Sequence, residues 1–444
     1  MQQFDTVIIG GGPGGLAAAY GLRGRGQNVA VVEKDLWGGT CPNRGCDPKK
    51  ILMAAVEAQG RSAVLQGYGL VGTPTIDWAA LMAKKRAYTR QIPTGTHAGL
   101  ERAGIATFHG DAQFTVDGTV QVAGQQLNAT NVIIATGQEP RLPQVTGQEW
   151  LRTSNDFLDL DTLPADVTLM GGGYVGVELA AIANSAGSRV HLVHHNARPL
   201  RAFDGDLVTD LLARLSKDGI DVRLGTEITQ VAPDGDQYRV TTADGEAWTT
   251  DLVFATAGRT PVVAELHLDR VGVATTSRGV TVNDHLQTTN PHIFALGDVV
   301  DRPQPKLTPV AGYEGDYLVK VLTTDEQAAI RYPVVPSVVY GKTQLAQLGV
   351  TPDQAATQPD RYRVNDLDLT HWYSYQRIQD PQARIKVVLE QDSGRIVGAA
   401  VLSTEAEQVI NYLDFVIQQR LSSVDINQMI MAYPTLASDL TYFS

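Results

Sequence analysis

Two cysteines offer the clearest chemistry in this sequence. Cys41 and Cys46 are its only cysteines, and they lie in the segment Gly-Gly-Thr-Cys-Pro-Asn-Arg-Gly-Cys-Asp-Pro-Lys-Lys. If this segment begins a helix, the four intervening residues bring the thiols together, and the positive helix N-terminus lowers the pKa of a thiol. The pair therefore predicts a reversible redox disulfide. Two buried structural thiols are the alternative, and the surrounding glycines, which indicate a tight exposed turn, count against it.

The chain before the cysteines predicts a dinucleotide-binding turn. An apolar run at residues 4–9 is typical of a buried parallel strand, and a helical run at residues 16–22 follows it. Between them lie three glycines at GxGxxG spacing: Gly10, Gly12 and Gly15. Glycine permits the turn and the close approach of a pyrophosphate, which the helix N-terminus attracts. The next strand ends in Glu33, which we expect to bind the hydroxyls of a ribose rather than to be an ordinary surface acid.

The same pattern returns in the middle of the chain. A strand at residues 167–170 precedes a second set of glycines: Gly171, Gly173 and Gly176. The next strand ends in basic residues, where an NAD site would carry an acid: His194, His195, Arg198 and Arg201. Basic groups at this place can accommodate a 2′-phosphate, so the cluster favours NADPH. NADH stays open, because the third position is Gly176 rather than the alanine variant.

No resident metal site is predicted. The two histidines lie at a strand end, where successive side chains face opposite ways. Neither they nor the cysteine pair has further ligands nearby at suitable spacing.

Three further strands end in small residues, which let the backbone pass close to a bound cofactor. They end in Ala-Thr-Gly137, in Ala-Thr-Ala-Gly258 and in Ala-Leu-Gly297-Asp298. We expect Asp298 to hydrogen-bond a cofactor hydroxyl, although Asp after Gly is also a common turn.

Composition limits the class of protein. The chain has 444 residues, enough for about three domains, and its net charge of −12 opposes binding to nucleic acid. Two cysteines suit a reducing cytoplasm, where we expect the protein to be located. No apolar run long enough to span a membrane occurs, and the glycine-broken N-terminus indicates strand, turn and helix rather than a signal peptide.

Beyond Pro333 the pattern changes to alternating strand signals, followed by a helical run at residues 405–419, which predicts a separate α+β domain. The predicted fold class is therefore α/β, with two Rossmann-like dinucleotide-binding domains and a C-terminal α+β domain.

The ordered motifs GxGxxG, GGTCxxxGCxPxK, ATG, GGGYxGxE, ATxGRxP, ALGD and LTPVA resemble the class I pyridine nucleotide-disulfide oxidoreductases, the family of glutathione reductase, lipoamide dehydrogenase and mercuric reductase. The resemblance implies FAD binding by residues 1–145 and 267–333, NAD(P) binding by residues 146–266, and a homodimer formed through residues 334–444. FAD would lie on the first glycine turn, Glu33 and Asp298, and the nicotinamide cofactor on the second turn.

The resemblance also implies roles around the flavin. Cys46 would face the flavin, and Cys41 would be the thiol that meets the acceptor. Lys50 and Glu178 occupy the positions of an ion pair beside the flavin, and Tyr174 that of a lid over the nicotinamide pocket. Alternatively, Lys50 and Glu178 are solvated charges on helices, and Tyr174 is a ring that packs in the fold.

The C-terminus departs from the family. Its disulfide reductases end in a His-Pro-Thr-x-x-Glu stretch, contributed across the dimer, whose histidine protonates the leaving thiolate. Here Tyr433 replaces the histidine, Ser438 replaces the glutamate, and Asp439 follows one place later. A phenol with a pKa of about 10 is a poor base at pH 7. Lys49, where the family usually has a small hydroxyl residue, is unexplained.

We therefore expect an FAD-dependent NAD(P)H oxidoreductase that reduces a small acceptor, with a metal ion or quinone favoured over glutathione disulfide. A reductase of another low-molecular-weight disulfide, with Tyr433 positioning the substrate, is the main alternative. A non-catalytic flavin sensor is a third possibility. The intact set of redox and flavin residues counts against it: Cys41, Cys46, Lys50 and Glu178.

Overall fold

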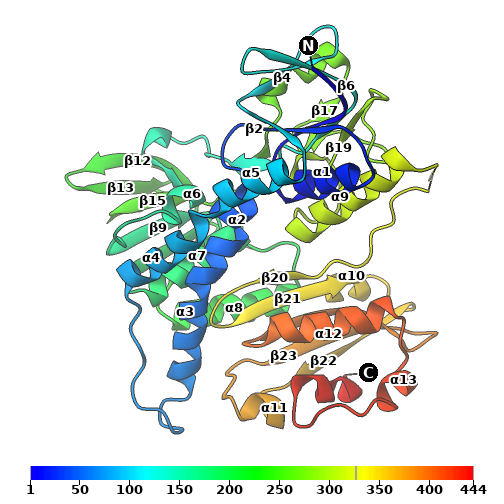
Figure 1. Ribbon diagram of the computed structural model, residues 1–444. Coiled ribbons are helices and arrows are strands. Elements are labelled where there is room, and N and C mark those ends of the chain that lie inside the picture. The colour runs from blue at the N-terminus through cyan, green and yellow to red at the C-terminus, as the bar shows by residue number, and fades with distance from the viewer. Residues whose placement is uncertain (1, 326–327, 444) are drawn as a thin grey trace. The chain divides into compact units, whose positions relative to one another are not determined.

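The computed structural model describes residues 2–325 and 328–443, and the chain packs into two compact units (Figure 1). Unit 1 comprises Met1–Lys50, Ala83–Arg141 and Gly258–Arg331. Unit 2 comprises Ile51–Met82, Leu142–Ala257 and Tyr332–Ser444. The domain limits drawn from the sequence at residues 145, 266 and 333 remain predictions.

A parallel sheet forms the centre of unit 1. Its strands neighbour one another in the order β3 (Ala106–His109), β2 (Val29–Glu33), β1 (Gln2–Ile9), β6 (Gln125–Ile134) and β19 (Ile293–Ala295). Alternate side chains of β1 enter different cores, with Val7 and Ile9 in one and Ile8 in the other. Burial on both faces explains why this strand appears as an uninterrupted apolar run.

Two helices cover one face of this sheet. Helix α1 (Pro13–Gly24) and helix α9 (Thr308–Thr323) pack against each other, and Leu22 and Leu318 join Ile8 in one core. The helices approach so closely that a Cβ on Gly14 would lie 3.1 Å from Cβ of Ala311. Antiparallel strands β4 (Ala112–Phe114) and β5 (Val120–Val122) extend the sheet beyond β6.

Unit 2 contains a second parallel sheet of the same type. Its strands follow the order β11 (Asp221–Leu224), β10 (Arg189–His194), β9 (Asp166–Met170), β15 (Leu252–Ala255) and β8 (Arg152–Thr153). Helix α7 (Tyr174–Ser185) joins β9 to β10, and helix α8 (Gly205–Lys217) joins β10 to β11. A separate antiparallel sheet contains β12 (Ile228–Asp234), β13 (Gln237–Thr242) and β14 (Ala247–Thr250). The two strand-turn-helix-strand arrangements confirm the prediction of two Rossmann-like domains.

The C-terminal part of unit 2 is an α+β domain, as predicted. Its antiparallel sheet has the order β20 (Ser337–Val339), β21 (Gln344–Gly349), β24 (Ile396–Ser403), β23 (Arg384–Glu390) and β22 (Tyr362–Asp368). Helix α12 (Ala406–Gln418) packs on β21 and β24, and the chain ends in the short 3-10 helix η5 (Leu436–Tyr442). Strands β21 and β22 are absent from the predicted elements.

The other helices and short strands complete the chain: α2 (Thr40–Arg44), α3 (Cys46–Val64), α4 (Trp78–Thr89), α5 (Ile92–Arg102), β7 (Gln138–Pro140), α6 (Ser154–Phe157), β16 (Arg259–Pro261), β17 (Thr275–Thr276), β18 (Gly279–Val280), α10 (Pro352–Ala356), α11 (Tyr373–Gln376) and α13 (Ser423–Asn427). None of the helices within the described ranges has the length and apolar character needed to cross a membrane.

Candidate active site

The two cysteines lie in two consecutive helices. Cys41 is in the first turn of α2, and Cys46 opens α3. In one continuous helix, residues five apart differ by about 140° around the axis, so the thiols would point to different faces. Gly45 interrupts the helix between them, and the thiols hydrogen-bond each other. The segment thus begins two closely spaced helices, and the thiols come together across the break at Gly45.

The hydrogen bond between the thiols separates their pKa values. Donation from Cys41 lowers the pKa of Cys46 to about 6, and the same bond, with burial, raises the pKa of Cys41. The hydroxyl of Thr308 lies 3.9 Å from the Sγ of Cys46 and further lowers its pKa. Cys46 is thus the thiolate of the pair near neutral pH, and a thiolate is both the nucleophile and the metal ligand of cysteine chemistry.

Charged neighbours act on Cys46 in opposite directions. The ammonium group of Lys49 lowers the pKa of Cys46, and the carboxylate of Asp47 raises it. Asp47 itself accepts a hydrogen bond of 2.6 Å from the hydroxyl of Tyr88. Sequence reasoning singled out Lys49 but missed Asp47, Tyr88 and Thr308. For Thr308 a signal existed, because it lies within the LTPVA motif.

The cysteine segment is attached to the first glycine turn. The N–H of Gly38 donates to the carbonyl of Gly11 over 2.9 Å. A Cβ on Gly39 would lie 2.6 Å from the Cα of Gly12, so only glycine permits this approach. The redox pair and the dinucleotide turn are therefore positioned together.

The first glycine turn is built by close backbone contacts. Gly10 has a φ of +116°, and a Cβ there would lie 2.3 Å from the carbonyl oxygen of Ala135, just before Gly137. A Cβ on Gly15 would lie 2.1 Å from the carbonyl oxygen of Gly10. This is the arrangement that lets a pyrophosphate approach the backbone at the start of α1, and the residues fit the dinucleotide part of FAD.

Glu33 lies beside this turn. Its Oε2 accepts from the N–H of Gly11 over 2.8 Å, and its Oε1 accepts from the N–H of Asp35 over 2.8 Å. The carboxylate is thus fixed at the end of β2, in the position from which an acid reaches ribose hydroxyls.

The strand ends that contain Gly137 and Gly258 meet. Strand β7 pairs with β16 in antiparallel fashion, the N–H of Val262 donates to the carbonyl of Gly137, and the N–H of Arg141 donates to that of Gly258. The two segments that we expect to pass close to a cofactor are therefore joined by antiparallel strand pairing in unit 1.

Gly297 and Asp298 form a third part of the same unit. The N–H of Gly297 donates over 2.7 Å to Glu314, a fully buried acid that also pairs with Arg302. Burial raises the pKa of Asp298 and lowers that of its neighbour Lys306 to about 8. Besides Arg302, Lys306 is a cation of this region that the sequence analysis did not single out.

The second glycine turn repeats the geometry of the first. Gly171 has a φ of +132°, and its Cβ would lie 2.5 Å from the carbonyl oxygen of Thr256. A Cβ on Gly176 would lie 1.9 Å from the carbonyl oxygen of Gly171. Gly173 precedes α7, whose first residue, Tyr174, is exposed. The turn therefore fits a second dinucleotide.

The basic cluster after β10 divides into engaged and exposed groups. Nδ1 of His194 accepts from the N–H of Gly172 over 3.2 Å. Arg198 pairs with Asp353 over 2.5 Å and donates to the carbonyl of Phe203. His195 and Arg201 are exposed at the end of the strand, where a 2′-phosphate would lie, and Nε2 of His195 accepts from the side-chain amide of Asn196 over 2.7 Å.

Lys50 and Glu178 are each fixed within their own unit. Lys50 lies one helical turn after Cys46 on the same face of α3. Glu178 is buried in α7, and its Oε1 accepts from the N–H of Tyr340 over 2.9 Å. Their pairing beside a flavin remains a prediction.

The C-terminal motif contains no acid–base dyad. Tyr433 is 79% exposed. Ser438 accepts from the N–H of Thr435 and donates its hydroxyl to the Thr435 carbonyl over 2.6 Å, so it serves the start of η5. Asp439 is buried, where desolvation raises its pKa and a hydrogen bond from Ser374 opposes the rise. Neither side chain orients Tyr433.

Comparison with known proteins agrees with this geometry. Residues 4–315 match the family of pyridine nucleotide-disulphide oxidoreductases, and residues 335–442 match the dimerisation domain of the same family. The chain is 32% identical to glutathione reductase of Burkholderia cepacia, over 98% of this chain and 97% of that one. It is 30% identical to dihydrolipoyl dehydrogenase of Geobacillus stearothermophilus, over 97% and 93%.

A solved structure with the same fold is the Cu(II) complex of a mutant of RclA, an HOCl-induced flavoprotein disulfide reductase from Escherichia coli. It superposes with a TM-score of 0.90 and 23% identity, covering 100% of this chain and 99% of that one. On the family matches and these relatives, the chain belongs to the pyridine nucleotide-disulphide oxidoreductase family.

Proposed function

We propose that this FAD-dependent oxidoreductase passes electrons from NADPH through the Cys41–Cys46 pair to a thiophilic metal ion, such as Cu(II) or Hg(II), or to a small quinone. Glutathione disulfide is a poor acceptor in this proposal. Family members are flavoproteins that use FAD and NAD(P)H, and the choice of NADPH and of the acceptor is the part proposed here.

The C-terminal motif is the observation that carries the proposal. Reducing a disulfide expels a thiolate that must be protonated, and general acid–base catalysis typically contributes about 100- to 10,000-fold to such a step. Tyr433 is an exposed phenol, and neither Ser438 nor Asp439 supports it. Reducing a metal ion requires no such proton, so the replacement of the family histidine harms this reaction less.

The thiol pair suits a soft ion. Thiolates are preferred ligands of Cu(I) and related soft metals. Cys46 supplies a thiolate near neutral pH because its pKa is lowered to about 6, first by Cys41 and then by Thr308. Cys41 becomes the second sulfur ligand when it loses its proton to the solvent on metal binding. A solved protein of the same fold, a cysteine-to-serine mutant of RclA, also binds Cu(II).

The electrons balance in each case. One NADPH supplies a hydride, which carries two electrons and leaves NADP+. Two Cu(II) ions then become two Cu(I), or one Hg(II) becomes Hg(0), with release of one proton. A quinone takes both electrons, the hydride's proton and one proton from solvent to give the hydroquinone. FAD, when bound, supplies the hydride acceptor and the relay to the sulfur pair.

The chain's own residues organise this relay. The two glycine turns hold the dinucleotides, with His195 and Arg201 available for the 2′-phosphate. Lys50, one turn after Cys46, would provide positive charge for the reduced flavin. Tyr174 covers the nicotinamide pocket, and Tyr433, contributed by the partner subunit in a homodimer, approaches the acceptor.

A reductase of another low-molecular-weight disulfide is the second candidate, favoured by the identity with glutathione reductase. Glutathione reductases carry arginines for the carboxylates of glutathione, and this chain has Tyr20 and Asp316 in the corresponding places. Both are exposed, and neither binds a carboxylate as an arginine does.

An acceptor screen tests the proposal. NADPH and NADH consumption is measured with Cu(II), Hg(II), small quinones, glutathione disulfide and other small disulfides. We expect turnover with metal or quinone to exceed turnover with any disulfide. Glutathione disulfide reduction at about 10 to 1,000 per second, the usual range for enzymes, would overturn the proposal.

A further inference from the structure

The segment between β10 and α8, which carries Arg201, is held by side chains of the C-terminal domain. Gln347 of β21 is only 8% exposed and makes two hydrogen bonds to the main chain of this segment. Its Nε2 donates to the carbonyl of Ala202 over 2.6 Å, and its Oε1 accepts from the N–H of Asp204 over 2.9 Å. One amide group thus fixes the backbone on both sides of Phe203, directly after Arg201.

A buried lysine holds the end of the same segment. Lys386 of β23 is 7% exposed, and its Nζ lies 3.1 Å from Oδ1 of Asp204 and 2.6 Å from Oδ2 of Asp206. Burial alone would lower the pKa of Lys386, but the two carboxylates raise it, so the lysine is charged. Asp204 also caps α8, because its Oδ1 accepts from the N–H of Leu207 over 3.0 Å. The lysine therefore fixes the start of α8.

Gln347 and Lys386 belong to one row of the C-terminal sheet. Gln347 in β21 and Lys386 in β23 both pair with Ala400 of β24, from opposite sides. Residues that face each other across strands project to the same face of a sheet, so the two side chains leave the sheet together. Ala400 lies in one core with Leu200 and Leu207. The row thus faces the segment with Arg201 and the start of α8.

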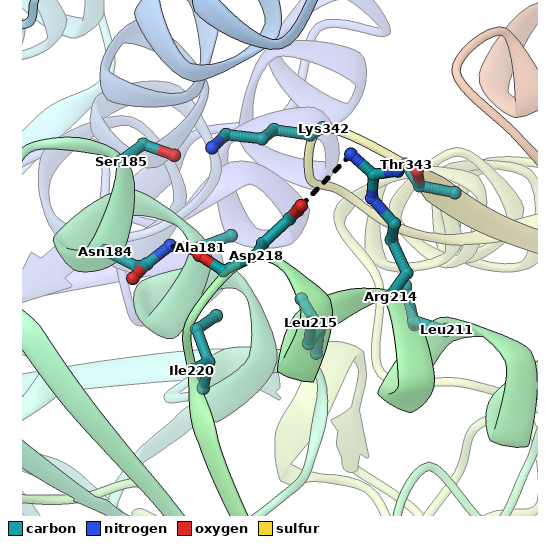
Figure 2. Close-up of a pocket in the computed structure, with 10 residues that line it drawn as sticks. All are labelled: Ala181, Asn184, Ser185, Leu211, Arg214, Leu215, Asp218, Ile220, Lys342 and Thr343. Carbon is teal, nitrogen blue, oxygen red and sulfur yellow. Dashed lines mark hydrogen bonds and ion pairs between the residues drawn. The ribbon is translucent and has the colours of Figure 1, made fainter. Parts of the chain in front are cut away.

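Helix α8 contacts the C-terminal domain further along its length as well. One turn after Asp206, the Oδ2 of Asp210 lies 2.7 Å from the Nη1 of Arg384 in β23. The last part of the helix lines a small pocket with the turn before β21, and Figure 2 shows the two sides of this pocket: Arg214 and Leu215 from α8, Lys342 and Thr343 from the turn. These later contacts bind the helix to the domain at a greater distance along the chain from Arg201.

On its other side, Arg201 follows a residue with an unusual backbone conformation. Leu200 has a φ of +46°, in the left-handed region that bulky residues seldom adopt. Its N–H donates to the carbonyl of Gly172 in the second glycine turn over 3.3 Å, and its side chain is buried. Such conformations persist only where the surroundings enforce them, and they cluster at ligand-binding sites. Arg201 is thus an exposed side chain on a backbone that is fixed before and after it.

The contacts of Gln347 and Lys386 do more than bury the helix. Apolar residues of α8, such as Leu207 and Leu211, already place one face of the helix in the core. The two polar side chains add hydrogen bonds that fit only one position of the segment. A buried polar network with its groups satisfied rigidifies a structure and specifies one arrangement. A guanidinium group needs such a fixed position, because it binds phosphate in a defined geometry.

We propose that Gln347 and Lys386 are positioning residues for nucleotide specificity, which hold Arg201 where it meets the 2′-phosphate of NADPH. They act through the main chain of the segment and through Asp204, and not by contact with the nucleotide. This inference rests on the proposed choice of NADPH. It adds that the C-terminal domain helps to determine which nucleotide the protein prefers.

Calorimetric titration of the oxidised, FAD-loaded protein with NADP+ and NAD+ tests this role without turnover. Gln347→Met keeps a long, uncharged side chain but removes both hydrogen bonds. It is expected to raise the dissociation constant for NADP+ severalfold, up to the roughly 10-fold of one charge-assisted contact, and to leave that for NAD+ unchanged. Arg384→Met is the matched control. It breaks an ion pair of the same interface one turn further from Arg201, and it is expected to change neither constant.

A double-mutant cycle tests whether Gln347 acts through Arg201. In the Arg201→Ala background, Gln347→Met is expected to cause no further loss of NADP+ affinity, because the effects of residues that act as one unit are not additive. Should Gln347→Met fail to fold, Lys386→Gln is measured in the same cycle with the same expectation.

The outcomes separate this inference from the choice of NADPH. Equal losses for NADP+ and NAD+, the same loss in Arg384→Met, or additive losses in the cycle would mean that the substitution merely loosens the interface, and would overturn the inference. Full NADP+ affinity in Gln347→Met, with a loss in Arg201→Ala, would refute the positioning role and leave the choice of NADPH standing. No loss in Arg201→Ala would refute the choice of NADPH, and the positioning role with it.

Discussion

The N–H of Gly172 donates to the Nδ1 of His194 over 3.2 Å, and the N–H of Gly11 donates to the Oε2 of Glu33 over 2.8 Å. The histidine thus occupies, in the second glycine turn, the position that the acid occupies in the first. Accepting this bond requires an unprotonated Nδ1, and burial lowers the pKa of His194 accordingly. His194 is neutral there, so we expect the positive charge for a 2′-phosphate to come from Arg201.

Nucleotide preference follows from this division. Arg201→Ala is expected to raise the Michaelis constant for NADPH by about 10-fold or more, the value of one charge-assisted hydrogen bond, and to leave that for NADH unchanged. Arg198→Ala is the matched control, with a smaller effect, because Arg198 is already paired with Asp353. Steady-state kinetics with both nucleotides measure this. A lower Michaelis constant for NADH than for NADPH in the unmodified protein would show that Gly176, and not the basic cluster, indicates the preferred nucleotide.

The two thiols have separate spectroscopic signatures. Two-electron reduction is expected to produce a long-wavelength absorption band from a thiolate lying against the flavin. Cys46→Ser abolishes this band and Cys41→Ser retains it, because only Cys46 has its pKa lowered to about 6. Identical spectra of the two variants would contradict the assignment of roles.

Removing either of the two opposite charges beside Cys46 is expected to shift the pKa of its thiol in opposite directions. Lys49→Thr removes a cation and raises the pKa of Cys46 above 6, whereas Asp47→Asn removes an anion and lowers it. The thiolate is present above its pKa and is lost as the pH falls through it. Metal reduction and alkylation by iodoacetamide should therefore lose rate towards acid pH, at a higher pH in Lys49→Thr and at a lower pH in Asp47→Asn. Alkylation rates of the reduced protein, followed against pH, give both midpoints, and shifts of the same sign would exclude this electrostatic origin.

Restoring the family dyad should restore disulfide chemistry. Tyr433→His combined with Ser438→Glu is expected to raise glutathione disulfide turnover without accelerating metal reduction. The upper limit of the gain is the roughly 100- to 10,000-fold that general acid–base catalysis contributes. Ser438→Glu alone is the control, because it removes the bond to the Thr435 carbonyl without supplying the imidazole that protonates the leaving thiolate. An equal gain with metal and disulfide would show that the substitution acts on an earlier step.

The glycine turns were predictable because their requirements are local. Gly10 and Gly171 have positive φ, and Gly15 and Gly176 lie against the carbonyl of the first glycine of their turn, so the spacing alone encodes the geometry. The buried parallel strands were predictable for a similar reason, since burial on both faces leaves an apolar run.

Strand β21 was missed because its glutamines make sense only in the folded protein. Gln344 and Gln347 are buried there, and their side-chain carbonyls accept from the N–H groups of Glu407 and Asp204. No local pattern shows such partners. The contact of Thr308 with Cys46, 262 residues away, and that of Tyr88 with Asp47 were hidden for the same reason.

Gly45 also bears on where the protein can store electrons. Its backbone leaves little room for a side chain, since a Cβ would lie 3.0 Å from the Thr40 carbonyl oxygen and 3.1 Å from the Cα of Cys41. While the two sulfurs are adjacent, electrons can be stored as a pair in the dithiol. A larger residue at position 45 would have to displace the backbone of Cys41, and any shift that kept the sulfurs from bonding would leave the flavin as the electron store. Such a protein would hold its two electrons on the flavin alone, away from the sulfur atoms that meet the acceptor.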